Sequence, residues 1–241
     1  SAAAIGSVFE RHHEQGLGEL ILSAVDATQA VVATNTNLGL ILLMAPLVKA
    51  VTPDSTGVQD VFAGLGPEDA RLVYQAISKM QPGGLGAVDD MDVAEQAPRS
   101  LLDAMEHAKS RDLIAAQYAN DIYDVFFVAS PKLRQYQQAG LSQPDAIVRT
   151  HVELMSIYPD SLIARKCGGV VAQESSVRAA AVLEQVPRGD KAYVAALADF
   201  DFWLRSDGHR RNPGTTADFI GAALLVGLIE GWLESPVQLQ R

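Results

Sequence analysis

Cysteine is almost absent from this sequence, since Cys167 is the single one among 241 residues. No intrachain disulfide can form, and neither a disulfide framework nor a cysteine-rich zinc site can be built. A reducing cytoplasm is the simplest setting for such a chain, so we expect a cytoplasmic location.

Basic residues are also scarce, because 19 lysines and arginines stand against 29 acidic residues and give a formal net charge of −10. This charge repels nucleic acid and anionic membrane surfaces, so neither is an expected partner. The longest apolar runs, 38–48 and 219–228, are too short to cross a bilayer. We expect buried helices there, which could include the subunit interface of a homo-oligomer.

Aromatic residues make up only 6% of the chain, whereas alanine and leucine dominate its long segments. This composition favours helices over sheets, and no strand-like alternation persists. We therefore predict an all-α fold, a single-domain helical bundle of roughly ten helices over residues 1–241. Residues 1–6 read like the interior of a helix, so we expect part of the natural N-terminus to be missing.

Helix start and stop signals give the expected elements. Pro67 followed by two acidic residues is typical of a helix start, and Ser100 can cap a long helix that ends before Pro131, with a break near Ser110 as an alternative. The longest expected loop is 83–98, and the stretch before Pro67 is expected to be a polar linker. The helices are predicted over 1–13, 17–32, 38–51, 67–80, 100–130, 131–139, 144–157, 161–186, 189–206 and 214–233.

Three polar segments, 33–39, 160–169 and 212–218, each lie at the start of a glycine-marked helix. A helix N-terminus offers unpaired N–H groups and positive potential, which suit phosphate, and glycine lets a ligand approach the backbone. Asparagine, threonine and aspartate at a helix start are also ordinary capping residues. Each segment taken singly therefore has a purely structural explanation.

Taken together, the three segments resemble the triphosphoribosyl-dephospho-CoA synthase family. Residues 35–39 read Asn-Thr-Asn-Leu-Gly where the family has Asn-Thr-His-Lys-Gly. Residues 160–169 begin with Asp-Ser and end with Lys-Cys-Gly-Gly, as the family's Asp-Thr-Asn segment runs into His-Arg-Gly-Gly. Residues 212–219 read Asn-Pro-Gly-Thr-Thr-Ala-Asp-Phe, which is similar to Ser-Pro-Gly-Gly-Ser-Ala-Asp-Leu. Their order is also the same.

The resemblance implies an all-helical transferase that moves a triphosphoribosyl unit from ATP to a hydroxyl of dephospho-CoA, with adenine leaving. Its expected partners are ATP and a nucleotide-like acceptor, and Mg²⁺ is the cofactor expected from ATP chemistry. Such a reaction needs a carboxylate near the oxocarbenium-like centre and cations near the triphosphate. The implied catalytic residues, which are also the predicted Mg²⁺ ligands, are Asp218, Asp160 and Asp26.

Each carboxylate has a structural alternative. Asp218 could compensate the dipole in the first turn of its helix, Asp26 could be the solvent edge of an apolar stripe, and Asp160 could be a cap. Arg165 and Lys166 could hold phosphates or simply be solvated, and Arg210 with Arg211 forms a second basic pair. The implied substrate-binding residues are Asn35, Thr36, Asn37, Gly39, Arg165, Lys166, Gly168, Gly169, Gly214, Thr215 and Thr216.

The remaining candidates carry weaker signals. Asp89, Asp90 and Asp92 could bind a divalent ion, although acidic loops are more often solvated. Cys167, which is flanked by Lys166 and glycines, could have a lowered thiol pKa, but a single cysteine without an identifiable base is usually a small buried residue. Ordinary surface or core roles are expected for His12, His13, His107 and His151.

Two departures from the family pattern leave the function open. Asn37 and Leu38 replace a histidine and a lysine, and residues 117–121 read Gln-Tyr-Ala-Asn-Asp where the family has Gly-Ala-Arg-Gly-Glu. A different acceptor in cofactor biosynthesis is one alternative. A non-catalytic helical nucleotide-binding or scaffold protein that retains the fold is the other.

Overall fold

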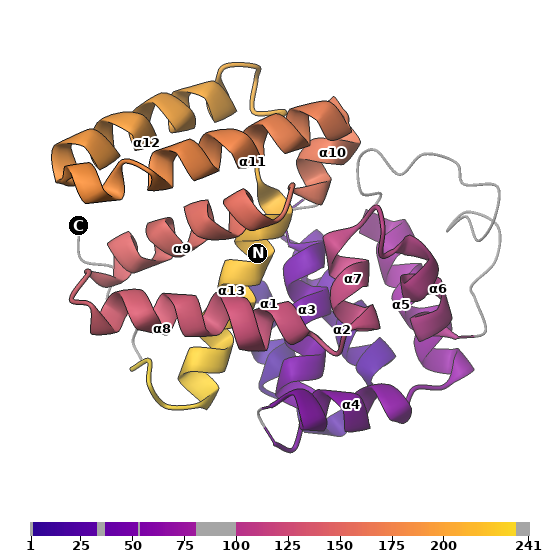
Figure 1. Cartoon of the computed structure of the whole chain (residues 1–241). Coiled ribbons are helices and arrows are strands. Elements are labelled where there is room, and N and C mark those ends of the chain that lie inside the picture. Colours follow the sequence, from indigo (N-terminus) through magenta and orange to yellow (C-terminus); the bar gives the residue numbers. More distant parts are fainter. Residues whose placement is uncertain (1, 33–36, 53, 81–99, 235–241) are drawn as a thin grey trace. The chain divides into compact units, whose positions relative to one another are not determined.

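The computed structural model describes residues 2–32, 37–52, 54–80 and 100–234, and within these ranges the chain forms helices and no strand (Figure 1). The predicted all-α fold is therefore confirmed. The chain divides into two compact helical units, residues 1–126 and 127–241, and each is described by itself. Within the described residues, no helix has the length and apolar character needed to cross a membrane.

Unit 1 is built around α2, which packs against α1, α3 and α5, while α3 also contacts α4 and α7. The apolar faces of α2 and α3 supply fully buried side chains, among them Leu20, Ile21, Ile41 and Leu43. Its helices are α1 (Ala2–Phe9), the short 3-10 helix η1 (His12–Glu14), α2 (Leu17–Gln29), α3 (Leu38–Lys49), α4 (Ser55–Ala63), α5 (Pro67–Met80), α6 (Leu101–Ala108) and α7 (Leu113–Ala119).

The packing of α2 on α5 depends on a close backbone approach at Gly18. The backbone N–H of Gly18 donates to Oδ1 of Asp69 at 3.0 Å, and the N–H of Gly66 donates to Oδ2 of the same carboxylate at 3.0 Å. A Cβ atom on Gly18 would lie 2.8 Å from Cα of Asp69. Only glycine lets the two helices approach this closely.

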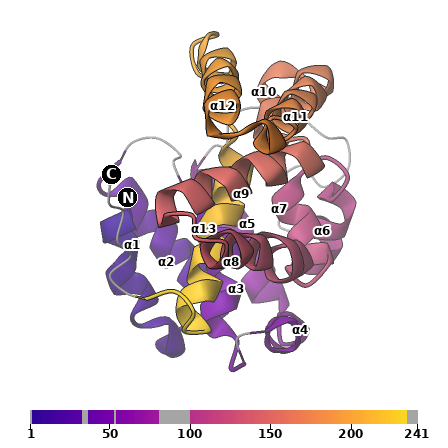
Figure 2. The same ribbon diagram turned by 60° about the vertical axis from the view of Figure 1, so that its left-hand side comes forward.

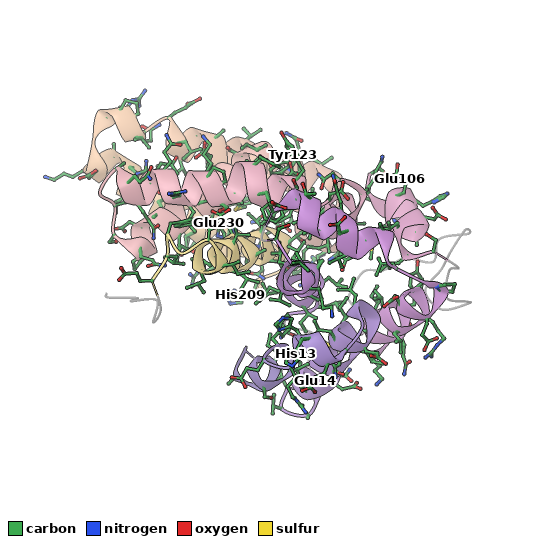
Figure 3. The ribbon with its side chains drawn as sticks, turned by 90° about the horizontal axis from the view of Figure 1, so that it is seen from below. His13, Glu14, Glu106, Tyr123, His209 and Glu230 are labelled. Carbon is green, nitrogen blue, oxygen red and sulfur yellow. The ribbon has the colours of Figure 1, made fainter. Side chains whose placement is uncertain are left out.

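The chain between α7 and the next helix is strained. Asp121 and Ile122 both have left-handed backbone angles, with φ of 57° and 58°, and a β-branched residue rarely adopts this conformation. Ile122 is nevertheless fully buried, and Asp124 accepts a hydrogen bond from the Gln117 amide at 2.6 Å. Figure 3 shows the exposed Tyr123 side chain on this turn. A π-helix, Val125–Ala129, follows directly.

Unit 2 is arranged around α9, which packs against α8, α11 and α13 (Figure 2). The side chains of α9, α10, α11 and α12 form one apolar core that includes Met155, Ile163, Val182 and Phe200. Cys167 packs against this core but is only partly buried, whereas a buried residue was expected. The helices are α8 (Ser130–Gln138), α9 (Gln143–Ile157), α10 (Ser161–Cys167), α11 (Gly169–Leu183), η3 (Val186–Arg188), α12 (Asp190–Arg205) and α13 (Gly214–Ile229).

Most predicted helices are found, but two predictions are wrong, the continuous helix over 161–186 and the polar linker before Pro67. The helix expected over 161–186 is two helices, α10 and α11, because Gly168 has a φ of 91° and turns the chain. For the helix expected over 100–130, the alternative of a break near Ser110 is confirmed, because α6 ends at Ala108 and α7 begins at Leu113, and a second break separates α7 from the π-helix. The polar linker before Pro67 contains α4, whose start Asp54 caps by accepting from the Gly57 N–H.

Candidate functional site

Asp160 joins two helix starts in unit 2. Its side chain is fully buried, and Oδ1 accepts hydrogen bonds from the backbone N–H groups of Leu162 at 2.8 Å and Ile163 at 3.1 Å. Oδ2 accepts from the backbone N–H and the hydroxyl of Thr216, both at 2.8 Å. One carboxylate therefore caps α10 and also satisfies an N–H in the first turn of α13.

The same two helices meet at a second polar contact. The hydroxyls of Ser161 and Thr215 lie 3.0 Å apart, and both side chains are buried. Gly214 packs so closely on α10 that a Cβ there would lie 2.5 Å from Cδ2 of Leu162. The segments 160–169 and 212–218, which lie far apart in the sequence, are thus brought together as expected for parts of one site.

The glycine pair that follows α10 is open to solvent. Gly168 and Gly169 are exposed, and a Cβ added to either would meet no atom within 4 Å. No side chain caps the start of α11, so its first N–H groups face this open backbone. Lys166 is exposed and Arg165 is partly buried in the last turn of α10. Arg210 fixes that turn by donating to the Lys166 carbonyl at 2.7 Å.

Asp218 is partly buried on α13 and is the fifth residue of this helix, which begins at Gly214. The alternative that Asp218 compensates the dipole in the first turn is therefore wrong, since that turn contains no acidic residue. Residues four apart share one face of a helix, so Asp218 lies one turn beyond Gly214 on the face that contacts α10.

The first polar segment belongs to unit 1. Asn35 and Thr36 lie outside the described residues, whereas Gly39 is partly buried in the first turn of α3. Asn37 occupies the N-cap position of α3, but its side chain makes no capping hydrogen bond. Its buried amide instead donates to the hydroxyl of Thr28 at 3.2 Å.

Asp26 also belongs to unit 1 and forms an ion pair with Lys79 of α5, with Oδ1 and Nζ 2.6 Å apart. The three carboxylates predicted as Mg²⁺ ligands are thus divided between the two units. Among the residues that the structure describes, no group of three histidine, cysteine, aspartate or glutamate side chains is arranged to hold a metal ion. The acidic residues Asp89, Asp90 and Asp92 fall outside that part of the chain.

His151 is a polar residue of this region that sequence reasoning assigned to an ordinary role. It lies on α9, and the backbone of Pro213 is close enough to its ring to influence its pKa. Burial lowers the pKa of His151, while the nearby charge of Asp160 raises it to a smaller extent. The ring therefore lies near Pro213 of the third polar segment and near the carboxylate of the second. Its position depends on helix packing, and no sequence motif indicates it.

Comparisons with known proteins agree on one family. The family described as ATP:dephospho-CoA triphosphoribosyl transferase matches residues 1–237. A solved structure from Archaeoglobus fulgidus, provisionally described as a triphosphoribosyl-dephospho-CoA synthase, has the same fold, with a TM-score of 0.74. It is 22% identical, and the alignment covers 96% of this chain and 98% of that chain. No match was found among curated protein sequences. The chain belongs to the ATP:dephospho-CoA triphosphoribosyl transferase family.

Proposed function

We propose that this transferase moves the triphosphoribosyl unit of ATP to a hydroxyl of dephospho-CoA, or of a related nucleotide-like acceptor in cofactor biosynthesis, and releases adenine. The family supports the reaction type. The observation that carries the proposal is the contact of Asp160 with Thr216, because it joins two of the three polar segments at the starts of α10 and α13.

The open backbone at Gly168 and Gly169 supports a phosphate-binding role. The first N–H groups of α11, a helix of 15 residues, lie at this glycine pair and have no side-chain cap. Uncapped N–H groups and the positive end of a helix favour anions, and the absence of Cβ atoms leaves room for phosphate oxygens. Arg165 and Lys166 stand one turn before, so we assign this end of α10 to the triphosphate.

The two candidate carboxylates in unit 2, Asp160 and Asp218, are assigned different roles. Asp160 accepts four hydrogen bonds, which occupy the acceptor positions of both oxygens, so we assign it to positioning α10 and α13. Asp218 is partly buried on α13, one turn after Gly214, the residue that packs on Leu162 of α10. We assign Asp218 to the stabilisation of positive charge that develops on the ribose when adenine leaves.

The residues present fit Mg²⁺ only as a partner of the ATP phosphates. Mg²⁺ is commonly held by one or two carboxylates together with substrate phosphates. Asp218, which is partly buried one turn into α13, would supply such a carboxylate. Asp160 is not assigned as a second ligand, because each of its oxygens accepts two hydrogen bonds. Bound in this way, Mg²⁺ would neutralise charge on the triphosphate.

Incubation with Mg²⁺, ATP and dephospho-CoA, followed by chromatography for adenine and mass spectrometry of the acceptor, tests the proposal. We expect adenine release and an acceptor heavier by one triphosphoribosyl unit. Asp218→Asn should lower kcat by roughly 100-fold, the scale of a lost electrostatic contact to the transition state. Asp199→Asn, an exposed position on α12, is the matched control and should retain wild-type activity.

A non-catalytic nucleotide-binding or scaffold role is the second candidate, and Asn37 and Leu38 favour it. Both side chains are buried, and neither offers the base or cation found in the family pattern. Isothermal titration with Mg²⁺ and ATP distinguishes the roles when combined with the adenine assay. ATP binding without adenine release, for dephospho-CoA and for other nucleotide acceptors, would support the non-catalytic role.

A further inference from the structure

Two neighbouring arginines hold the loop that joins α12 to α13, residues 206–213. Arg210 donates from Nη2 to the carbonyl of Lys166 at 2.7 Å, in the last turn of α10. Arg211 donates from Nη1 to the carbonyl of Trp203 at 2.8 Å, in the last turn of α12. The loop is therefore bonded to the ends of α10 and α12 before it enters α13.

The guanidinium of Arg211 makes several further contacts. Its Cζ lies 4.4 Å from the centroid of the Trp203 ring, and Nη1 also donates to Oγ of Ser206 at 3.3 Å. Nε lies 3.3 Å from Oδ2 of Asp207 in an ion pair, and the Arg211 side chain is only 23% exposed. Trp203 in turn packs against the apolar core of unit 2. A planar guanidinium can stack on a ring and donate in its own plane at the same time, which lysine cannot do.

The backbone conformation of the loop needs such an anchor. Gly208 and His209 both have left-handed backbone angles, with φ of 71° and 65°. A residue other than glycine adopts this conformation at a cost, and it persists only where its surroundings impose it. Only two residues separate Arg211 from Gly214, the first residue of α13. A shift at Arg211 is therefore passed directly to the first turn of α13.

The first turn of α13 depends on contacts of this kind more than the rest of the helix does. Within the described residues, no side chain caps its start. From Phe219 onward the helix is held by buried side chains such as Ala223, and it packs against α8 and α9. Loss of the contacts of Arg211 would therefore displace the end of α13 that carries Thr216 and Asp218 without unfolding the helix.

On the basis of the proposed function, we propose that Arg211 is a positioning residue of the transferase, which holds the first turn of α13 in place against α10. Asp160 holds this turn from the side of α10 through Thr216, and Arg211 holds it from the side of α12 through Trp203. The carboxylate of Asp218 is assigned above to the transition state, so Arg211 acts on turnover through Asp218 and not by contact with a substrate.

Arg211→Met removes the guanidinium but keeps an unbranched side chain that can pack on Trp203. We expect kcat for adenine release to fall by about 10- to 100-fold, the scale of a small misplacement of a catalytic group. The KM for ATP should stay close to the wild-type value, because the glycine pair assigned to the triphosphate lies outside α13. A wild-type kcat for a variant that circular dichroism shows to be folded would overturn the proposal.

Arg178→Met is the matched control. Cζ of Arg178 lies 4.6 Å from the centroid of the same Trp203 ring, but its guanidinium pairs with Glu174 of its own helix and not with the loop. This variant loses a cation over the ring and leaves the loop in place, so it should retain the wild-type kcat. An equal loss of kcat in Arg178→Met and Arg211→Met would contradict the proposal, because it would trace the effect to Trp203 alone.

A double-mutant cycle with Asp218→Asn separates positioning from a general loss of structure. If Arg211 acts through Asp218, Arg211→Met should lower kcat by no more than about twofold in the Asp218→Asn background, within the error of such cycles. Independent effects multiply, so the full reduction in that background would refute the role of Arg211 as a positioning residue.

Hydrogen exchange measured by mass spectrometry tests the anchor without any turnover. Arg211→Met should raise the exchange rate of amides in 212–218 by about tenfold and leave that of 219–229 unchanged, because only the first turn loses support. Unchanged exchange in 212–218, or an equal rise along the whole of α13, would contradict the proposal. Absence of adenine release from the wild-type protein would refute the proposed reaction alone, and the exchange rates would still decide the role of Arg211 in holding α13.

Discussion

Oδ2 of Asp160 accepts hydrogen bonds from both the backbone N–H and the hydroxyl of Thr216, 56 residues further along the chain. Oδ1 of the same carboxylate caps α10 through Leu162 and Ile163. Two helix N-termini, each with positive potential, thus converge on one buried negative charge. The carboxylate fixes the relative position of α10 and α13, and with them two of the polar segments.

Replacement of this carboxylate by an amide tests its structural role. Asp160→Asn puts an NH₂ group where either the Thr216 donors or the α10 backbone donors point, so at least one buried donor loses its acceptor. We expect the free energy of unfolding to fall by about 2–4 kcal/mol, because two or more hydrogen bonds to a charged group are affected. Urea unfolding followed by circular dichroism measures the loss.

Asp112→Asn is the control for Asp160→Asn. Asp112 caps α7, also a helix of seven residues, through the N–H groups of Ile114 and Ala115. Asparagine is nearly as good a cap as aspartate, so the loss should stay within about 0.5 kcal/mol. Equal losses for the two variants would show that the bond to Thr216 adds nothing to stability.

The hydroxyl of Thr216 should contribute separately. Thr216→Val keeps the shape and the backbone N–H but removes the bond to Asp160, and we expect a loss of about 1.5–3 kcal/mol because the acceptor is a charged, buried group. Thr150→Val is the comparison, since the buried Thr150 hydroxyl donates only to the Ala146 carbonyl of its own helix. Thr150→Val should lower the free energy of unfolding by less than Thr216→Val does. A larger loss for Thr150→Val in urea unfolding would contradict the argument that a charged acceptor strengthens the bond of Thr216.

The helices could largely be predicted from the sequence, because apolar periodicity and capping residues are local signals. The helix expected over 67–80 matches α5 at both ends, and the expected start at residue 38 is the start of α3. The break at Gly168 was missed because glycine also occurs inside helices, and α4 was missed because its few buried residues, such as Val58, give a weak apolar pattern.

The site could be predicted only in part. The resemblance identified segments 160–169 and 212–218, and the structure brings these two together. The sequence could not show that Asp160 is saturated with hydrogen bonds, since two of the four bonds that it accepts are donated by Thr216. His151 could not be recognised either, because its relation to Pro213 arises from the packing of α9 against α13.

Gly18→Ala should destabilise unit 1 even though alanine is the better helix former. The added Cβ would lie 2.8 Å from Cα and 2.9 Å from the carbonyl oxygen of Asp69, and backbone atoms cannot yield as a side chain can. We expect a loss of about 1–3 kcal/mol in the free energy of unfolding. Gly6→Ala in α1 has no atom within 4 Å of the new Cβ and should instead gain up to about 1 kcal/mol. If thermal melts showed that Gly18→Ala and Gly6→Ala stabilise the protein equally, the close approach at Gly18 would be ruled out.

The lowered pKa of His151 predicts how stability depends on pH. Its ordinary value of 6.5 applies to the unfolded chain, and burial places the folded-state pKa below that value despite the opposing charge of Asp160. As the pH falls below about 6.5, the unfolded chain binds a proton that the folded protein does not, so the free energy of unfolding decreases. The contribution is fully present above that pH and is lost on acidification toward the folded-state pKa.

Urea unfolding at several pH values between about 7.5 and about 5 measures this dependence. The free energy of unfolding of the wild type should decrease as the pH falls over this range. For His151→Gln it should depend less on pH, because the glutamine amide does not titrate. His107→Asn should keep the wild-type slope, since His107 is exposed. Carboxylates with a lowered pKa, such as Asp54 and Glu68, act only at more acidic pH and leave this comparison intact. A wild-type slope that persists in His151→Gln would assign the dependence to another group.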